Sequence, residues 1–460
     1  MEGLNREMST LYRAIALKTL FQNTPCTRSD AGLNVIDEAD GSEDGEGITR
    51  DDLQLVMARP NDPFATRFRL SVPSPADMRW CGFLDALCVL CWFGQGGESV
   101  VSIGAQQQLD GKIKFILTTN DGSILKPVKH FKDVLALLSC FLCGELDEPA
   151  TINEVAKRSI TLAKDKILNY RSRLRSQLAL LRQDQAQYDS ESEALLDTLG
   201  QWLPQRQFDR YLLCQRAYDF RGSQQDRLLA IKASTDIKTY RIIRHYMGRL
   251  GSYHAAASVV VEGADEFAGT IRGATVGWIE ASSTLSRSTA FTVGNDIATL
   301  VTTACPRLRH FQGRTAEVVA RLEGATSLLH DYRTVAQKPV VHAEAAMAHH
   351  FHRKQLQFAR GLRYIGCSKA SCYLCDLYFS RHPAGFIRRS CSGRAWLRWE
   401  LPRTNPPSLR QDESLENLRI IRDMLDAIHH DLDNDIDGGR YGMKAEFDST
   451  TGMSIPLSTA

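Results

Sequence analysis

Four side chains between residues 341 and 376 have the types and the spacing of a metal-dependent catalytic site. A histidine and a glutamate stand two residues apart, at His342 and Glu344, and a C-x-x-C pair follows at Cys372 and Cys375. One imidazole and two thiolates supply three ligands for a tetrahedral zinc ion and leave the fourth position to water, which is a catalytic layout. The nearby carboxylate need not be a ligand.

The histidine and the glutamate must sit at the start of a helix if both are to face one metal. Residues two apart in a helix point roughly 200° apart, so an interior position would separate them. Pro339 precedes the triplet and the helix-favouring run 345–347 follows it, which suits a first helical turn at His342 and Glu344.

The two cysteines are expected at the start of a second helix. They stand three residues apart and therefore share one helix face. Ser371 directly precedes them and is predicted to cap this helix. A helix N-terminus lowers the pKa of a thiol and so favours the thiolate that zinc requires.

A closed structural site is the alternative to a catalytic one. It needs a fourth protein ligand, and Cys367, Cys391 or His382 is close enough in sequence to supply it. A reduced, buried cysteine pair beside a surface glutamate is a further alternative. H-x-E by itself carries little information, and C-x-x-C by itself is also a weak signal.

The ordered combination of the two motifs resembles the zinc-dependent cytidine deaminase-like superfamily. The words around it, VVHAEAAMAHHF and LRYIGCSKASCYLCDLYF, are similar to a deaminase-like family found largely in fungi. This resemblance implies a Zn²⁺ cofactor on His342, Cys372 and Cys375, with zinc-bound hydroxide as the nucleophile. It also implies that Glu344 shuttles protons while ammonia leaves a nucleobase of a nucleotide or a single-stranded nucleic acid.

Two departures from the family pattern keep a second function open. Many members of the superfamily have proline directly before the first cysteine, where this chain has Ser371. Ser392 stands where fungal-type relatives have a histidine in an Arg-Gly-x-His-Gly-like turn. The alternative is a non-catalytic deaminase-fold protein with a structural zinc and a helical partner-binding surface, and a helical interaction protein with a fortuitous motif is a third reading.

The predicted fold class is α/β, an α-β-α layered cytidine deaminase-like core with a large all-helical insertion. Its first helix is expected at 83–93, its hairpin strands at 99–106 and 112–119, and a strand before the cysteines at 363–367. A fourth strand is expected at 385–389. Asn120 then lies where several superfamily members have a substrate-contacting asparagine, and Tyr373 and Lys369 are further expected substrate contacts.

The domain boundaries follow from these elements. We expect an N-terminal helix and an acidic disordered loop in 1–62, the first helix and hairpin of the core in 63–122, and the helical insertion in 123–335. The zinc-binding core then occupies 336–412, and a C-terminal helix and a loose tail occupy 413–460. Helices of the insertion are predicted at 153–187, 190–203, 207–220, 226–249 and 315–335, and they offer a surface for a protein partner.

Composition predicts an intracellular protein that is neither secreted nor inserted in a membrane. The 460 residues include 12 cysteines but begin without a charged-then-apolar signal segment. The other C-x-x-C pairs, Cys88/Cys91 and Cys140/Cys143, are most simply core residues, although together they could build a second zinc site.

The net charge is only +2, yet the stretch 353–410 holds twelve Lys or Arg residues against two acidic ones. These basic residues are interleaved with aromatic residues. They suit either a phosphorylated substrate or a solvated basic face.

Overall fold

A computed structural model describes residues 2–23, 74–94, 99–183, 190–203, 209–223, 237–279, 297–310, 312–322, 340–402 and 411–438. The chain divides into two compact units. The sheet unit comprises 43–280, 354–370 and 447–460, and the helical unit comprises 1–42, 281–353 and 371–446. The domain boundaries predicted from the sequence stay predictions.

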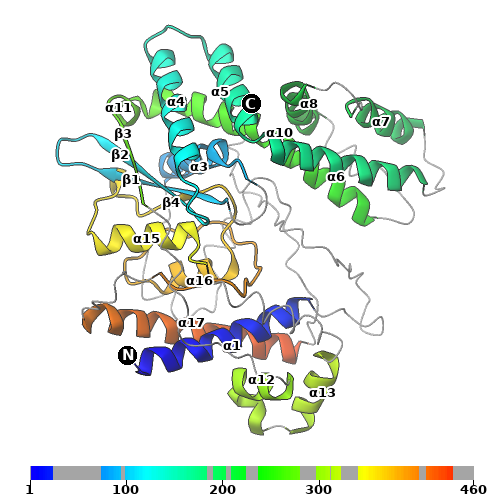
Figure 1. Ribbon diagram of the computed structural model, residues 1–460, viewed down its shortest axis with the longest axis vertical. Coiled ribbons are helices and arrows are strands. Elements are labelled where there is room, and N and C mark those ends of the chain that lie inside the picture. Colours follow the sequence, from blue (N-terminus) through cyan, green and yellow to red (C-terminus); the bar gives the residue numbers. More distant parts are fainter. Residues whose placement is uncertain are drawn as a thin grey trace. The chain divides into compact units, whose positions relative to one another are not determined.

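The sheet unit contains a four-stranded mixed sheet with the order β3-β2-β1-β4 (Figure 1). Strands β1 (Val101–Gln107) and β2 (Ile113–Thr119) form the antiparallel hairpin that the sequence predicts. Strand β4 (Ile365–Cys367), the predicted strand before the cysteines, pairs antiparallel with β1 in the register Ser102 to Cys367. A hairpin and a strand far apart in sequence are therefore neighbours.

Helix α3 (Pro75–Cys91) packs behind this sheet and is held to β4 by a buried carboxylate. It begins earlier than the predicted 83–93 helix, because Ser74 and Asp77 form a capping box at its N-terminus. Asp85 on this helix accepts hydrogen bonds from the Tyr364 hydroxyl at 2.7 Å and from the Cys367 N–H at 3.0 Å. Cys88 and Cys91 are buried side chains of the same helix.

Strand β3 (Thr275–Trp278) pairs parallel with β2 and is not predicted from the sequence. It comes from a stretch rich in small residues that shows no clear hydrophobic period. With β3, the sheet is mixed, and the described residues are mostly helical. This arrangement is compatible with an α/β core that carries additional helices.

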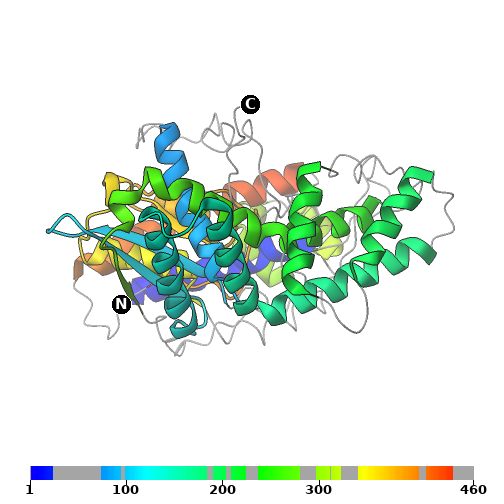
Figure 2. The same ribbon diagram turned by 90° about the horizontal axis from the view of Figure 1, so that it is seen from above.

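Helices make up most of the rest of the sheet unit. Figure 2 shows the green helices of this unit extending away from the sheet. The predicted helix 153–187 is two helices, because the chain breaks at Ala163, whose ψ is 21°. The elements are α4 (Leu125–Leu142), α5 (Glu148–Leu162), α6 (Lys164–Gln183), α7 (Ser190–Gln201), α8 (Arg210–Ser223), α10 (Ile237–Glu266) and α11 (Ala268–Ile271).

Two long helices lie side by side in the helical unit, α1 (Glu2–Asn23) and α17 (Gln411–Asp437) (Figure 1). Ion pairs join them, Lys18 to Asp435 and Glu7 to Arg422. The other elements of this unit are α12 (Ile297–Ala304), η2 (Pro306–His310), α13 (Gln312–Leu322), α15 (Ala343–Arg353) and α16 (Tyr373–Arg381).

The prediction of a strand at 385–389 is wrong. The backbone there is irregular because Gly385 adopts a left-handed φ of 64°, which interrupts an extended strand. Phe386 anchors the segment instead, with its ring 5.6 Å from Phe379 and 4.9 Å from His382, centroid to centroid.

Some predictions fall outside the described residues. They are the acidic loop at 37–46, Pro339 before the histidine, and parts of the helices predicted at 226–249 and 315–335. Within the part of the chain that is described, no helix is long and apolar enough to cross a membrane.

Candidate metal centre

His342 directly precedes α15, as predicted. Its carbonyl oxygen accepts a hydrogen bond from the Ala346 N–H at 2.9 Å, which closes the first turn of the helix. Glu344 is the second residue of α15, and its side chain is buried. The imidazole and the carboxylate therefore both come from the start of α15.

The N-cap of α16 is Cys372, so the prediction that Ser371 caps this helix is wrong. Cys372 has the extended backbone of a cap, with φ −74° and ψ 164°, and its Sγ accepts from the Cys375 N–H at 3.4 Å. Ser371 is buried one position earlier, where its N–H donates to Ser390 and it bridges to Cys391. The cysteine itself is thus placed at the positive end of the helix.

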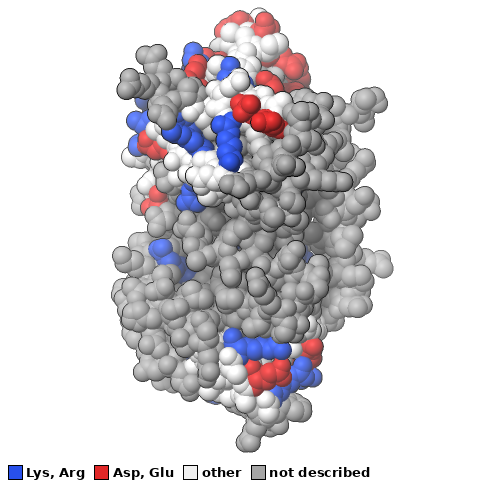
Figure 3. Space-filling model, turned by 90° about the vertical axis from the view of Figure 1, so that its right-hand side faces the viewer, with Lys and Arg blue, Asp and Glu red and all other residues white. Residues whose placement is uncertain are grey.

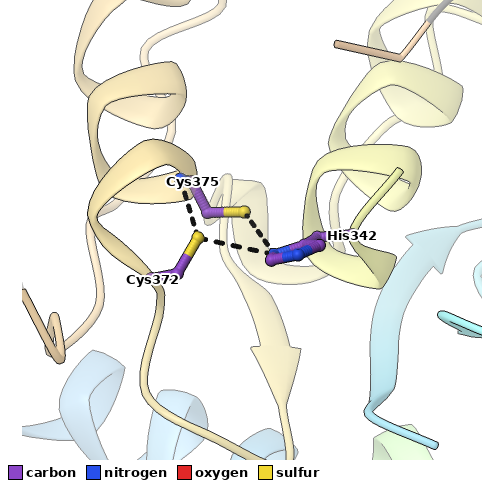
Figure 4. A group of neighbouring side chains, drawn as sticks. All are labelled: His342, Cys372 and Cys375. Carbon is purple, nitrogen blue, oxygen red and sulfur yellow. Dashed lines mark hydrogen bonds between the residues drawn. The ribbon is translucent and has the colours of Figure 1, made fainter. Parts of the chain in front are cut away.

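The imidazole and the two thiols converge from the starts of two helices (Figure 4). His342 Nδ1 lies 3.4 Å from Cys372 Sγ and 3.4 Å from Cys375 Sγ. A tetrahedral zinc ion with ordinary Zn–N and Zn–S bonds would separate such atoms by about 3.6 Å. These three residues, which we call the histidine–cysteine cluster, could bind a metal ion, and all their ligand atoms lie within 4.8 Å of one another.

The electrostatics of the cluster favour a thiolate at Cys372. Burial raises the pKa of this thiol, but hydrogen bonds from Cys375 and the nearby His342 outweigh burial and lower the pKa to about 6. Burial and the Cys372 sulfur raise the pKa of Cys375 well above its usual value. The carboxylate of Glu344, a buried residue, raises the pKa of both thiols.

Trp399 touches the cluster, and sequence reasoning missed this role. Its indole N–H donates to Cys375 Sγ at 3.2 Å, and its side chain is fully buried. The N–H of Glu400 donates to Val340 at 2.9 Å, and the Val340 N–H donates to Arg398 at 2.6 Å, so a bridge ties the tryptophan segment to the residues before His342. A tryptophan among many gives no sequence signal for this contact.

Basic residues of the 353–410 stretch are partly used within the fold. Arg388 forms a bidentate ion pair with Asp376, the residue directly after Cys375, with nitrogen–oxygen distances of 2.8 and 2.5 Å. Arg389 is buried. On the face drawn in Figure 3, described Lys and Arg side chains lie beside described Asp and Glu side chains. That face does not show a broad patch of one sign among its described residues.

The predicted substrate contacts lie in both units. Tyr373 belongs to the helical unit, is buried, and donates its hydroxyl to Asp431 at 2.8 Å. Asn120 and Lys369 belong to the sheet unit. Asn120 follows β2 and its N–H donates to Val100, whereas the Lys369 ammonium lies 5.0 Å from the centroid of the Trp92 ring. Contact of any of the three with a substrate stays a prediction.

The candidates for a fourth protein ligand do not join the cluster among the described residues. Cys367 is in strand β4 of the sheet unit. The Cys391 sulfur accepts from the Gly393 N–H at 3.3 Å. His382 lies with His352 and Glu416 instead. Its ring is buried, and burial together with the nearby His352 and His349 lowers its pKa to about 3.

Comparison with known proteins points to one chemistry. None of the curated proteins or solved structures that were searched matches this chain. A family model described as an OTT_1508-like deaminase does match, over residues 341–403. The segment that is similar to a deaminase family is thus the segment that holds the histidine–cysteine cluster, Glu344 and Trp399.

Proposed function

We propose that residues 341–403 form the zinc-dependent centre of a hydrolytic deaminase that acts on a nucleobase in a nucleotide or a nucleic acid. The observation that carries the proposal is the convergence of His342 Nδ1 with two cysteine sulfurs at 3.4 Å each, within a segment that matches a deaminase family. Three ligands of this kind leave a tetrahedral zinc ion one position for water.

The residues present fit zinc. His342 contributes a ring nitrogen, and Cys372 and Cys375 contribute sulfurs at the positive end of α16. Zinc held there would act as a Lewis acid that lowers the pKa of a bound water molecule from about 15.7 in bulk water to roughly 7. Trp399 directs its N–H at the Cys375 sulfur, and this hydrogen bond favours the thiolate over the thiol.

Glu344 is the residue that moves protons in this proposal. The residue is 3% exposed, and its carboxylate raises the pKa of both thiols. It takes a proton from the attacking water and passes it to the ring nitrogen of the base. It then transfers the remaining proton, from the newly added hydroxyl group, to the departing amine. One water is consumed, the exocyclic amino group leaves as ammonia, and the base gains a carbonyl oxygen.

In this proposal α3, the β1–β2 hairpin and β4 are the first elements of an α-β-α layered fold of the cytidine deaminase-like type. The pairing of β1 with β4 supports this arrangement, because the hairpin and the strand before the cysteines then belong to one sheet. In this core, Asn120 and Lys369 would contact the substrate. The similarity of the sequence segments around the two motifs supports membership of this chain in the fungal-type family.

The test is ammonia release from cytosine- and adenine-containing nucleosides, nucleotides and single strands. Glu344→Gln should keep the zinc of the wild type and lose at least about 100-fold in rate, as expected for a lost general base. Glu317→Gln, the same change at an exposed glutamate of the helical unit, should keep the rate. Full turnover by zinc-loaded Glu344→Gln would refute the role of this carboxylate. A zinc-loaded wild type inactive on every substrate would favour a structural zinc.

A further inference from the structure

A second group of metal-ligand types lies in the helical unit, apart from the histidine–cysteine cluster. It consists of His352, His382 and Glu416, whose candidate ligand atoms all lie within 4.8 Å of one another. His352 Nε2 is 2.9 Å from Glu416 Oε1. The rings of His352 and His382 stand nearly perpendicular, at 87°, with their centroids 4.7 Å apart.

The three residues come from three helices. The two histidines lie at the C-terminal ends of α15 and α16, whereas the first cluster lies at the N-terminal ends of the same two helices. His342 precedes α15 and His352 stands in its last turn, whereas Cys372 caps the start of α16 and His382 caps its end. At 1.5 Å per residue, the two ends of α15 are about 15 Å apart. The second group is therefore too far away to share a metal with the histidine–cysteine cluster. Glu416 comes from α17.

We propose that His352, His382 and Glu416 form a second divalent metal site, of the two-histidine, one-carboxylate type that binds Zn²⁺. The site would join the C-terminal ends of α15 and α16, whose N-terminal ends hold the first cluster, and would tie both to α17. The two histidine-bearing helices would then be cross-linked at both ends. Its role follows from this placement: it holds fixed the two helices on which the first cluster is built.

The donor types of the group, two imidazoles and a carboxylate, are ones that bind zinc. His382 is 1% exposed and the side chains of His352 and Glu416 are 21% and 34% exposed, so one ligand would be buried and two would be partly open to solvent. His382 Nδ1 accepts the Ala384 N–H at 3.1 Å, which leaves the ring proton on Nε2 when no metal is bound. A metal on Nε2 would displace this proton to Nδ1 and break the Ala384 hydrogen bond, which would weaken binding by a factor on the order of ten.

The competing explanation is an ordinary ion pair between His352 and Glu416 beside a neutral core histidine. Cobalt distinguishes the two, because Co²⁺ bound to thiolates has an intense near-ultraviolet charge-transfer absorption that Co²⁺ bound only to nitrogen and oxygen lacks. The protein would be titrated with Co²⁺ alone, and wild type would be compared with Glu416→Gln and His352→Gln. Both changes are made at partly exposed positions, so the fold should survive. His350→Gln, at a half-buried position on the same helix, is the matched control.

We expect wild type and His350→Gln each to bind two equivalents of Co²⁺. One equivalent should give the thiolate absorption, and the second should bind without adding to it. Glu416→Gln and His352→Gln should each lower the affinity for this equivalent by at least about tenfold while leaving the thiolate absorption intact. A wild type that binds no second equivalent, or variants that bind it as tightly as wild type, would overturn the site. Because the thiolate absorption reports the first cluster separately, failure of the second site and failure of the proposed deaminase centre give different results.

Discussion

Replacing Trp399 by phenylalanine tests the link between the second half of the deaminase-like segment and the metal ligands. The change removes the indole N–H that donates to Cys375 Sγ at 3.2 Å and keeps an aromatic ring in the same buried place. His342 Nδ1 lies farther from this sulfur, at 3.4 Å. The variant thus isolates a single outer contact of the cluster.

The size of the effect follows from the charge and burial of the acceptor. A hydrogen bond to a charged group contributes about 1.5 to 3 kcal/mol, and here both partners are fully buried, so water cannot replace the lost donor. At about 1.4 kcal/mol per factor of ten, the expected loss of zinc affinity is roughly 10- to 100-fold, in line with other outer contacts of metal ligands. The thiolate is destabilised, and the metal that needs it binds more weakly.

The assay is competition for Zn²⁺ with a chromophoric chelator at constant pH. Trp396→Phe, the same replacement at a half-buried tryptophan three residues earlier, is the control and should keep wild-type affinity. Because Trp399→Phe also loses packing, the unfolding temperature of the zinc-free proteins should be measured separately. A folded Trp399→Phe protein with an affinity within twofold of wild type would refute the reasoning.

Two further predictions concern the sheet unit. A Cβ added at Gly366 would meet the backbone carbon and oxygen of Leu84 at 2.9 Å, so Gly366→Ala should lower the free energy of unfolding by about 1 to 3 kcal/mol in denaturant titrations. Gly269→Ala, which meets nothing within 4 Å, should be close to neutral; equal effects of the two changes would contradict the close contact. Burial, and to a lesser degree nearby Arg158, lowers the pKa of His130 to about 4 from 6.5, so the unfolded chain takes up the proton first as the pH falls. Stability of the α4–α5 region is therefore fully present above pH 6.5 and should fall by about 3 kcal/mol toward pH 4; hydrogen exchange should show this loss in wild type and not in His130→Gln.

The sequence predicts the elements that local pattern specifies. Alternating apolar residues around Asp110 and Gly111 indicate the hairpin, and the apolar run after Phe83 indicates the buried helix α3. The first turn at His342 follows from the geometry of a helix, because only there can an imidazole and a carboxylate two residues apart face one metal. These features need no knowledge of distant contacts.

The features that sequence reasoning misses depend on tertiary contacts or on competition between neighbouring residues. Strand β3 is stabilised by its pairing with β2 and not by its own composition, which is rich in small residues. Ser371 is a good cap by propensity, but the backbone bridge to Cys391 holds it outside the helix, and the cap falls to Cys372. The grouping of His382 with Glu416 likewise requires α17 to lie beside α16, which no local pattern reveals.

The most direct test of the metal centre is the absorption spectrum of the full chain with saturating Co²⁺, compared with the double variant Cys372→Ser/Cys375→Ser. Binding by His342 and two thiolates predicts an intense charge-transfer absorption in wild type that disappears in the double variant. Absence of this absorption in wild type would contradict the centre. Its persistence in the double variant would assign the metal to other cysteines of the chain and would remove the basis for deaminase chemistry at this cluster.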